Sequence, residues 1–360
     1  IATEPRKRSA ALRPQAKFDG PMKRILPSAR ILRRTIASMA EIWDGNGQPA
    51  AGASKRLSMR VAKASAATRS GLSRYPRELL ASIRDAGLPR RLVRPMLPLA
   101  GFESSRLAAA WVGHATVLMR IGGQTVITDP VFSERIGMSV GSVTLGIARL
   151  LPPALDVEHL PKIDLVLLSH AHFDHLDKPS LRRLAAGPAR GATVITADRT
   201  RSLVPSGFGE VIQLNWGRQV RIGDVRVHAL RPVHWGARTA VDRRRGYNAY
   251  LIEHGRERVL FGGDTAYTDA FDQVGNVDLS VLGIGAYQSW DGAHATPEQV
   301  WSMFTRHAGK PGAKLLPMHH ATFDMGETRA DEPLARLVAA AGANAAKIVC
   351  REVGGVWQSE

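Results

Sequence analysis

Chemically reactive side chains concentrate at positions 169–177 of this 360-residue chain, in the run Ser-His-Ala-His-Phe-Asp-His-Leu-Asp. The run holds three of the 12 histidines together with two carboxylates. Imidazole and carboxylate are ligand types that suit Zn²⁺, Mn²⁺ or Fe. His170 and His172 are one residue apart, so in extended backbone both project to the same side and can hold one ion. Asp174 and His175 follow a turn and can reach a second ion.

Short apolar runs predict the elements that must position this cluster. Residues 163–168, directly before it, are typical of a strand covered on both faces. Hairpins are predicted at residues 111–127, 220–230 and 250–261, and buried strands at 277–282 and 315–318. Helices are predicted at residues 180–186, 297–307 and 332–341. Hairpins with interleaved helices indicate an α+β protein in which two packed sheets carry helices outside.

Further candidate ligands follow three of the predicted strands. They lie in Pro-Val-His-Trp at 232–235, Phe-Gly-Gly-Asp-Thr at 261–265 and Pro-Met-His-His at 317–320. Each motif by itself is a weak signal. Their weight comes from their order along the chain and from their common position after a predicted strand.

The run at 169–177 resembles the signature of the metallo-β-lactamase superfamily, whose fold is an αββα sandwich with a dinuclear metal site. The resemblance implies two divalent ions, Zn²⁺ first and Mn²⁺ or Fe as alternatives. It implies that one ion is bound by His170, His172 and His234, the other by Asp174, His175 and His319, with Asp264 bridging. His320 is an alternative to His319, but the family pattern His-x-x-Thr-Phe matches only from His319.

Within the superfamily, residues 111–118, 128–133 and 262–267 are similar to the N-acyl-phosphatidylethanolamine phospholipase D branch. The likeness covers about residues 110–337 and extends more loosely to ascorbate-phosphate lactonases. It implies a phosphodiesterase that acts on N-acyl-phosphatidylethanolamine or a related phospholipid, with water activated by two ions. The alternatives are a sugar-acid phosphate lactonase, a nuclease, and a lipid- or nucleic-acid-binding scaffold with a vestigial site. The cysteine-dependent lactamase subclass is disfavoured because position 264 is Asp.

The residues predicted to take part in catalysis are Asp174, Asp264, His294 and His114. His294 precedes a predicted helix start, a position that suits contact with anionic oxygen. The sequence allows two roles for the His114 side chain: contact with the substrate phosphate, or filling of the inside of the hairpin. Asp129 is expected to accept hydrogen bonds that orient a metal ligand, with direct binding of a metal as the alternative.

Apolar surface at the site mouth would be needed to hold acyl chains. Trp235, Tyr287 and Trp290 are candidates to line it, and each could instead be an ordinary core aromatic. The expected partner is a phospholipid or another phosphodiester. A peripheral membrane surface is a further candidate partner, specific nucleic-acid binding is not expected, and an oligomer is compatible with the sequence.

Composition separates a basic N-terminal part from the rest. Hydrophobic content of 44% is ordinary for a globular protein, and the single cysteine, Cys350, excludes a thiolate-rich metal site. The net charge is +17, and residues 1–100 alone hold 21 Lys and Arg against 6 Asp and Glu. We therefore predict a basic, partly disordered extension at residues 1–105 and a catalytic domain at 106–360.

One stretch of the extension, residues 28–43, predicts an amphipathic helix with Leu32, Ile36, Met39 and Trp43 on one face. Such a helix either lies on an anionic membrane or docks on the protein's own core. No run reaches the roughly 18 apolar residues that span a bilayer. The predicted location is therefore cytoplasmic or peripheral to a membrane, without an integral segment.

Overall fold

The computed structural model describes residues 92–140, 143–239, 242, 244–290, 292–325 and 329–359. All of these belong to the larger of two units of the chain, Met59–Glu360. The amphipathic helix predicted for residues 28–43 lies outside the described residues. None of the helices in the described ranges combines the length and apolarity needed to cross a bilayer.

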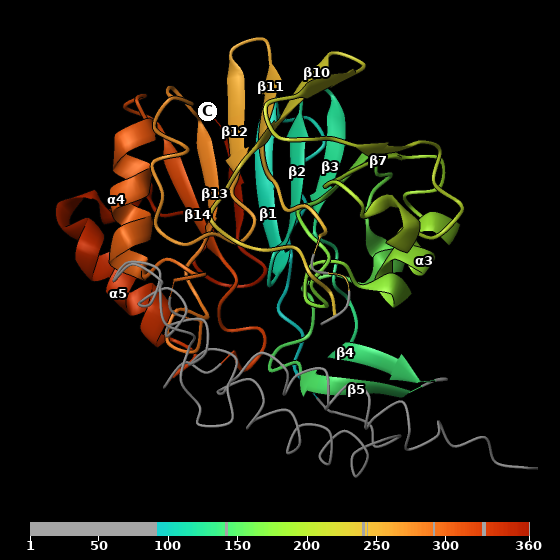
Figure 1. Ribbon diagram of the computed structural model, residues 1–360. Coiled ribbons are helices and arrows are strands. Elements are labelled where there is room, and N and C mark those ends of the chain that lie inside the picture. Colours follow the sequence, from blue (N-terminus) through green and yellow to red (C-terminus); the bar gives the residue numbers. More distant parts are fainter. Residues whose placement is uncertain are drawn as a thin grey trace, which may run out of the picture. The chain divides into compact units, whose positions relative to one another are not determined.

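Two mixed β-sheets form the centre of the described region (Figure 1). The first sheet has the order β15 (Val356–Gln358), β1 (Leu107–Gly113), β2 (Thr116–Ile121), β3 (Gln124–Thr128), β6 (Leu165–Leu168), β7 (Thr193–Thr196) and β8 (Val211–Gln213). The second has the order β14 (Lys314–Met318), β13 (Leu279–Gly283), β12 (Glu257–Phe261), β11 (Ala249–His254), β10 (Val225–Leu230) and β9 (Gln219–Ile222). A separate hairpin pairs β4 (Arg135–Val140) with β5 (Val143–Ala148) and lies outside both sheets (Figure 1).

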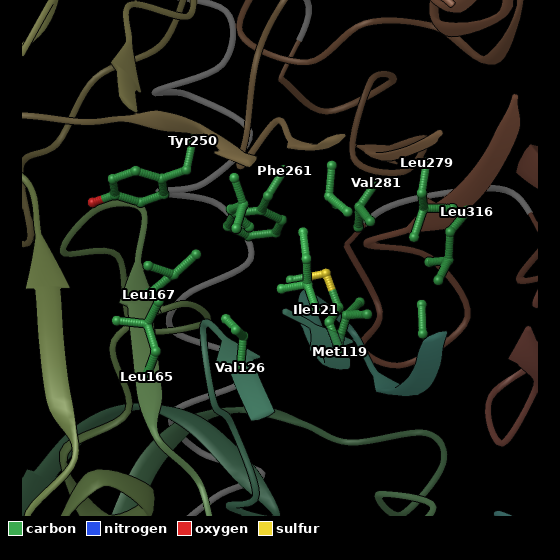
Figure 2. Close-up of a cluster of buried hydrophobic side chains, with 14 of the residues drawn as sticks. Met119, Ile121, Val126, Leu165, Leu167, Tyr250, Phe261, Leu279, Val281 and Leu316 are labelled. Carbon is green, nitrogen blue, oxygen red and sulfur yellow. The ribbon is translucent and has the colours of Figure 1, made fainter. Parts of the chain in front are cut away.

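Buried side chains fill the space between the sheets and cover both outer faces. Alternate residues of the strands face the shared core, so Met119, Ile121, Val126, Leu165 and Leu167 of the first sheet meet Tyr250, Phe261, Leu279, Val281 and Leu316 of the second (Figure 2). Helix α3 (Lys178–Ala186) packs Leu181 and Leu184 on the outer face of the first sheet. Helices α4 (Pro297–His307) and α5 (Glu332–Ala341) cover the second. The predicted αββα sandwich is thus confirmed.

The strongest local signals predicted their elements closely. Helices α4 and α5 have the predicted bounds, and the three predicted hairpins turn at glycines 122–123, 223 and 255, all with positive φ. Strands β1, β4, β5, β7, β8 and β15 were not predicted. Trp111, expected at the start of a hairpin, lies on β1 instead. Phe102 is fully buried under the first sheet, so the packed region includes residues before the predicted boundary at 106.

Parallel pairing explains why the chemically reactive segments meet. Strands β3, β6 and β7 are parallel, as are β12, β13 and β14. The carboxyl ends of parallel neighbours lie at one edge of a sheet. The segments that follow β3, β6, β12 and β14 carry Asp129, residues 170–175, Asp264 and His319 respectively.

Candidate metal centre

Two adjacent groups of ligand atoms form at this edge. In each group, one ligand atom from every residue lies within 4.8 Å of the others. The first group is His170, His172, His234 and Asp264, and the second is His114, Asp174, His175 and His319. A further group joins His294 to Asp264 and His319. The structure therefore brings together all seven predicted ligands, with both additional histidines beside them.

Asp264 lies between the two groups. Its Oδ2 is 3.6 Å from Nε2 of His234 and 3.8 Å from Nε2 of His170, both in the first group. The same oxygen is 3.0 Å from Nε2 of His175, and Oδ1 is 3.4 Å from Nε2 of His319. Asp264 is thus the carboxylate that faces both sets of imidazoles, as a bridging ligand must.

A glycine allows Asp264 to take this position. Gly263 has φ of +56°, and a Cβ there would lie 2.9 Å from Cβ of Ser169 and 3.0 Å from the carbonyl oxygen of Asn248. A side chain at this position would therefore be strained and would also clash. The turn after β12 can approach the cluster only because residue 263 has no side chain.

Asp129 orients two of the imidazoles from behind. Its Oδ1 accepts from the Ser169 backbone N–H at 2.7 Å, and its Oδ2 accepts from Nδ1 of His175 at 2.7 Å. Oδ2 also accepts from the Ser169 hydroxyl at 2.5 Å, and that hydroxyl oxygen accepts from Nδ1 of His170 at 2.8 Å. Both histidines are thereby held with Nε2 toward the cluster. The predicted hydrogen bonds of Asp129 are confirmed.

The first group presents unprotonated nitrogens. His234 donates from Nδ1 to the carbonyl oxygen of Ala293 at 3.2 Å, which leaves Nε2 free to face the cluster. Nε2 of His170 and Nδ1 of His172 are only 2.7 Å apart. Burial lowers the pKa of His170 well below its usual value, that of His172 to about 4 and that of His234 to about 3. These imidazoles are therefore neutral at pH 7, the form that binds metal.

Two buried carboxylates supply negative charge to the same place. Burial alone would raise the pKa of Asp264, but His175, His319 and His294 hold it well below the usual range. For Asp174, burial is likewise outweighed by His175 and by the hydrogen bond from His114, so its pKa is also well below the usual range. Both carboxylates are ionised at neutral pH and attract a cation.

Several buried ligand atoms lie within ion-pair distance of one another but form no hydrogen bond. Within the described part of the chain, Nε2 of His175, Nε2 of His319 and Oδ1 of Asp264 are buried and accept or donate no hydrogen bond. Leaving one buried polar atom unsatisfied costs about 1–3 kcal/mol. Atoms of this kind that converge from three segments fit a bound metal, which would satisfy them together.

His114 belongs to the second group and is fully buried. Its Nε2 is 3.1 Å from Oδ2 of Asp174, and its carbonyl oxygen accepts from the backbone N–H of His319 at 3.1 Å. Its own N–H donates to the hydroxyl of Thr322 at 2.9 Å. His114 and His319 both have positive φ, 53° and 63°, in a region that non-glycine residues rarely adopt. This strain marks the junction of the β1–β2 turn with the segment after β14.

His294 and His320 differ in their position relative to the ligand groups. The His294 side chain is near the surface at 9% exposure, and its Nε2 is 3.8 Å from Oδ2 of Asp264. His320 belongs to none of the groups, and its ring lies 4.7 Å from that of Trp111. Of the two adjacent histidines, the structure places His319 in the cluster, in agreement with the family pattern.

The three aromatic residues predicted to line the mouth of the site differ in exposure and in contacts. Trp235 is 38% exposed, and its ring lies 4.5 Å from that of His234. Trp290 is half-buried, 5.9 Å from Trp235. Tyr287 is buried, donates its hydroxyl proton to Glu332 of α5 and is covered by a guanidinium. Its contacts are those of a residue that anchors α5.

Arg238 was not predicted as a site residue, yet it contacts the backbone of the 169–177 run. Its Nη1 donates to the carbonyl oxygens of Ala171 and Leu176. Its position four residues after His234 was the only available signal, because backbone carbonyl partners leave no trace in residue types. Ser169, adjacent to His170, was missed as an orienting group because its other partner, Asp129, is 40 positions away in the sequence.

Comparisons with known proteins agree with this architecture. The family model described as "Beta-lactamase superfamily domain" matches residues 124–320. An uncharacterised protein of Mycobacterium tuberculosis is 31% identical over 255 residues, which cover 66% of this chain and 65% of that protein. The chain thus matches slightly less than two thirds of the length of this relative. The N-acyl-phosphatidylethanolamine-hydrolyzing phospholipase D 1 of Caenorhabditis elegans is 28% identical over 244 residues, covering 63% of this chain and 67% of the enzyme.

A solved structure shows the same fold. The metallo-beta-lactamase fold protein YhfI of Bacillus subtilis superposes with a TM-score of 0.50 at 18% identity, covering 71% of this chain and all of that protein. The family match extends from β3 to the histidines after β14 and so includes most of the ligand segments. The chain therefore belongs to the β-lactamase superfamily domain family and has the metallo-β-lactamase fold.

Proposed function

We propose that the chain is a dinuclear metal-dependent hydrolase, and that it acts as a phospholipase D-like phosphodiesterase on N-acyl-phosphatidylethanolamine or a related phospholipid. The observation that carries the proposal is Asp264, whose Oδ2 faces imidazoles of both ligand groups and whose Oδ1 faces His319 of the second group. The similarity to the nematode phospholipase D supports the substrate class. A peripheral membrane surface, as the source of such a substrate, belongs to the same proposal.

Each residue of the centre has a role in this proposal. One ion would be held by His170, His172 and His234, the other by Asp174, His175 and His319, with Asp264 shared between them. When bound, two such ions supply Lewis-acid polarisation of a phosphoryl oxygen and activation of water at neutral pH. His294 has a side chain that is 9% exposed and would contact the substrate phosphate. His114 is fully buried and would orient Asp174 through their hydrogen bond.

The surroundings favour a lipid over a small polar lactone. Trp235 exposes part of its ring beside His234, and the neighbouring Val233 is 44% exposed. Exposed apolar side chains next to a charged site are suited to hold acyl chains. A scaffold with a vestigial site is disfavoured because all the predicted imidazole and carboxylate ligands are present and their ligand atoms lie close together.

A substrate screen tests the proposal directly. We expect the metal-loaded protein to release phosphatidic acid from N-acyl-phosphatidylethanolamine and to cleave bis-p-nitrophenyl phosphate, and the chelator-stripped protein to do neither. Sugar-acid lactones and RNA complete the panel, with products followed by mass spectrometry. If only lactones are turned over, the protein is a lactonase and the phosphodiesterase assignment is wrong. If only RNA is cleaved, the protein is a nuclease.

The acyl-binding role of Trp235 has its own test. In Trp235→Ala we expect KM for a long-chain N-acyl-phosphatidylethanolamine to rise about tenfold, because burial of apolar surface against the acyl chain is lost. Cleavage of bis-p-nitrophenyl phosphate, which has no acyl chain, should stay near the wild-type rate. Trp216→Ala is the control, since Trp216 is equally exposed at 38% but packs on Tyr247 and Arg231. Equal changes in both variants would refute a specific role.

A further inference from the structure

Arg238 connects the two halves of the candidate metal centre. It lies in the segment after β10, four residues beyond His234 of the first group. We propose that Arg238 is a positioning residue that holds the 172–175 segment in its metal-binding shape and ties it to the segment that carries His234. This inference rests on the metal centre of the proposed function but not on the identity of the substrate.

The first observation is a pair of hydrogen bonds that bracket the ligand loop. Nη1 of Arg238 donates to the carbonyl oxygen of Ala171 at 2.9 Å and to that of Leu176 at 2.7 Å. The residues enclosed between these two carbonyls are 172–175, which include three of the seven predicted ligands. One guanidinium nitrogen therefore fixes the distance between the start and the end of the loop.

The second observation is a stacking contact inside the same loop. The Arg238 guanidinium carbon lies 3.9 Å from the centroid of the Phe173 ring. A guanidinium is planar, so its edge can donate to carbonyls while its face lies on an aromatic ring. Phe173 lies between His172 and Asp174, and fixing its ring limits rotation of the backbone that carries both.

The remaining bonds within the loop do not provide this closure. The backbone N–H groups of His175 and Leu176 donate to the carbonyl oxygen of His172, which forms a single turn. Asp177 accepts from the N–H of Ser180 and caps α3. These contacts shape the end of the loop. The segment that carries His234 meets the loop where Nε2 of His234 lies 3.4 Å from Nδ1 of His172, and Arg238 of that segment holds both ends of the loop through the carbonyls of Ala171 and Leu176.

The chain offers a matched control arginine away from the centre. Arg258 on β12 is also half-buried, donates from Nη1 to the carbonyl oxygen of Gly275 at 2.6 Å and pairs with Glu253. It touches none of the ligand groups. Arg258→Ala therefore removes a comparable arginine and its carbonyl bond without touching the loop.

The test compares Zn²⁺ affinity with stability in the full chain. Apparent affinity is measured by competition with a chelator, and the stability of the metal-free protein by urea unfolding, for Arg238→Ala, Arg238→Lys and Arg258→Ala. We expect Arg238→Ala to weaken Zn²⁺ binding about 10–100-fold, the range for residues that orient metal ligands. Arg238→Lys should recover part of the loss, since an ammonium can reach the carbonyls but cannot stack and donate as a planar fork does.

The control decides between positioning and general stability. Arg258→Ala should lower the unfolding free energy yet keep Zn²⁺ affinity within about twofold of wild type. Equal Zn²⁺ affinities in Arg238→Ala and Arg258→Ala would overturn the inference. A wild-type protein that binds Zn²⁺ but cleaves no phosphodiester would refute the proposed function alone, because the affinity comparison still stands. A wild-type protein that binds none of Zn²⁺, Mn²⁺ and Fe²⁺ would overturn both.

Discussion

Asp264→Asn is expected to lose at least about 10³-fold in kcat/KM for bis-p-nitrophenyl phosphate, equivalent to about 4 kcal/mol of transition-state stabilisation. Asn is neutral and offers one acceptor oxygen in place of two. It therefore removes the charge that faces both groups, including the oxygen 3.0 Å from Nε2 of His175. Elemental analysis should show about two metal equivalents in wild type and clearly fewer in the variant.

Asp278→Asn is the control for loss of a partly buried carboxylate. Asp278 accepts from Nζ of Lys310 at 2.7 Å and from the backbone N–H of Arg258 at 2.8 Å, and it belongs to none of the ligand groups. We expect the metal content and kcat/KM of this variant to match wild type even if its unfolding midpoint falls. An Asp264→Asn protein that keeps the wild-type metal content and rate would contradict the bridging role.

The adjacent histidines after β14 should behave in opposite ways. In His319→Ala we expect the metal content to fall from about two equivalents to about one and activity to fall by about 10²–10³-fold, because one nitrogen of the second group is lost. In His320→Phe the ring that packs on Trp111 is retained. Metal content and activity should therefore stay at wild-type values.

Stability gives the second measurement for this pair. Within the described region, both ring nitrogens of His320 are buried without a hydrogen-bond partner. Replacing an unsatisfied polar group by an apolar one of similar shape is neutral or stabilising, by up to about 1–3 kcal/mol. Urea unfolding of metal-free His320→Phe should show an unfolding free energy equal to or above that of wild type. Loss of metal in His320→Phe but not in His319→Ala would make His320 the ligand.

Elements whose sequence contains both end signals and a clear period were predicted with the correct first and last residues. Helix α4 begins with Thr296 as N-cap and Pro297 in the first turn, and Gln299 completes a capping box. Its helical pattern then runs to His307. By contrast, β15 has three residues, and it forms part of a sheet only because it pairs with β1, which is more than 240 positions away. Short strands of this kind have too few residues to show a period, so their existence depends on a distant partner.

The residue types of the centre and their order along the chain were enough to predict a metal-binding cluster and its superfamily. Imidazole and carboxylate ligands can be recognised from the residue types alone. Tertiary structure decided the rest. It placed Asp129 behind His170 and His175, His114 beneath Asp174 and a guanidinium across the ligand loop. These contacts join residues 46 to 67 positions apart, and the last of them ends on a backbone carbonyl, a group that every residue possesses. Only the folded chain determines which of those carbonyls meets which side chain.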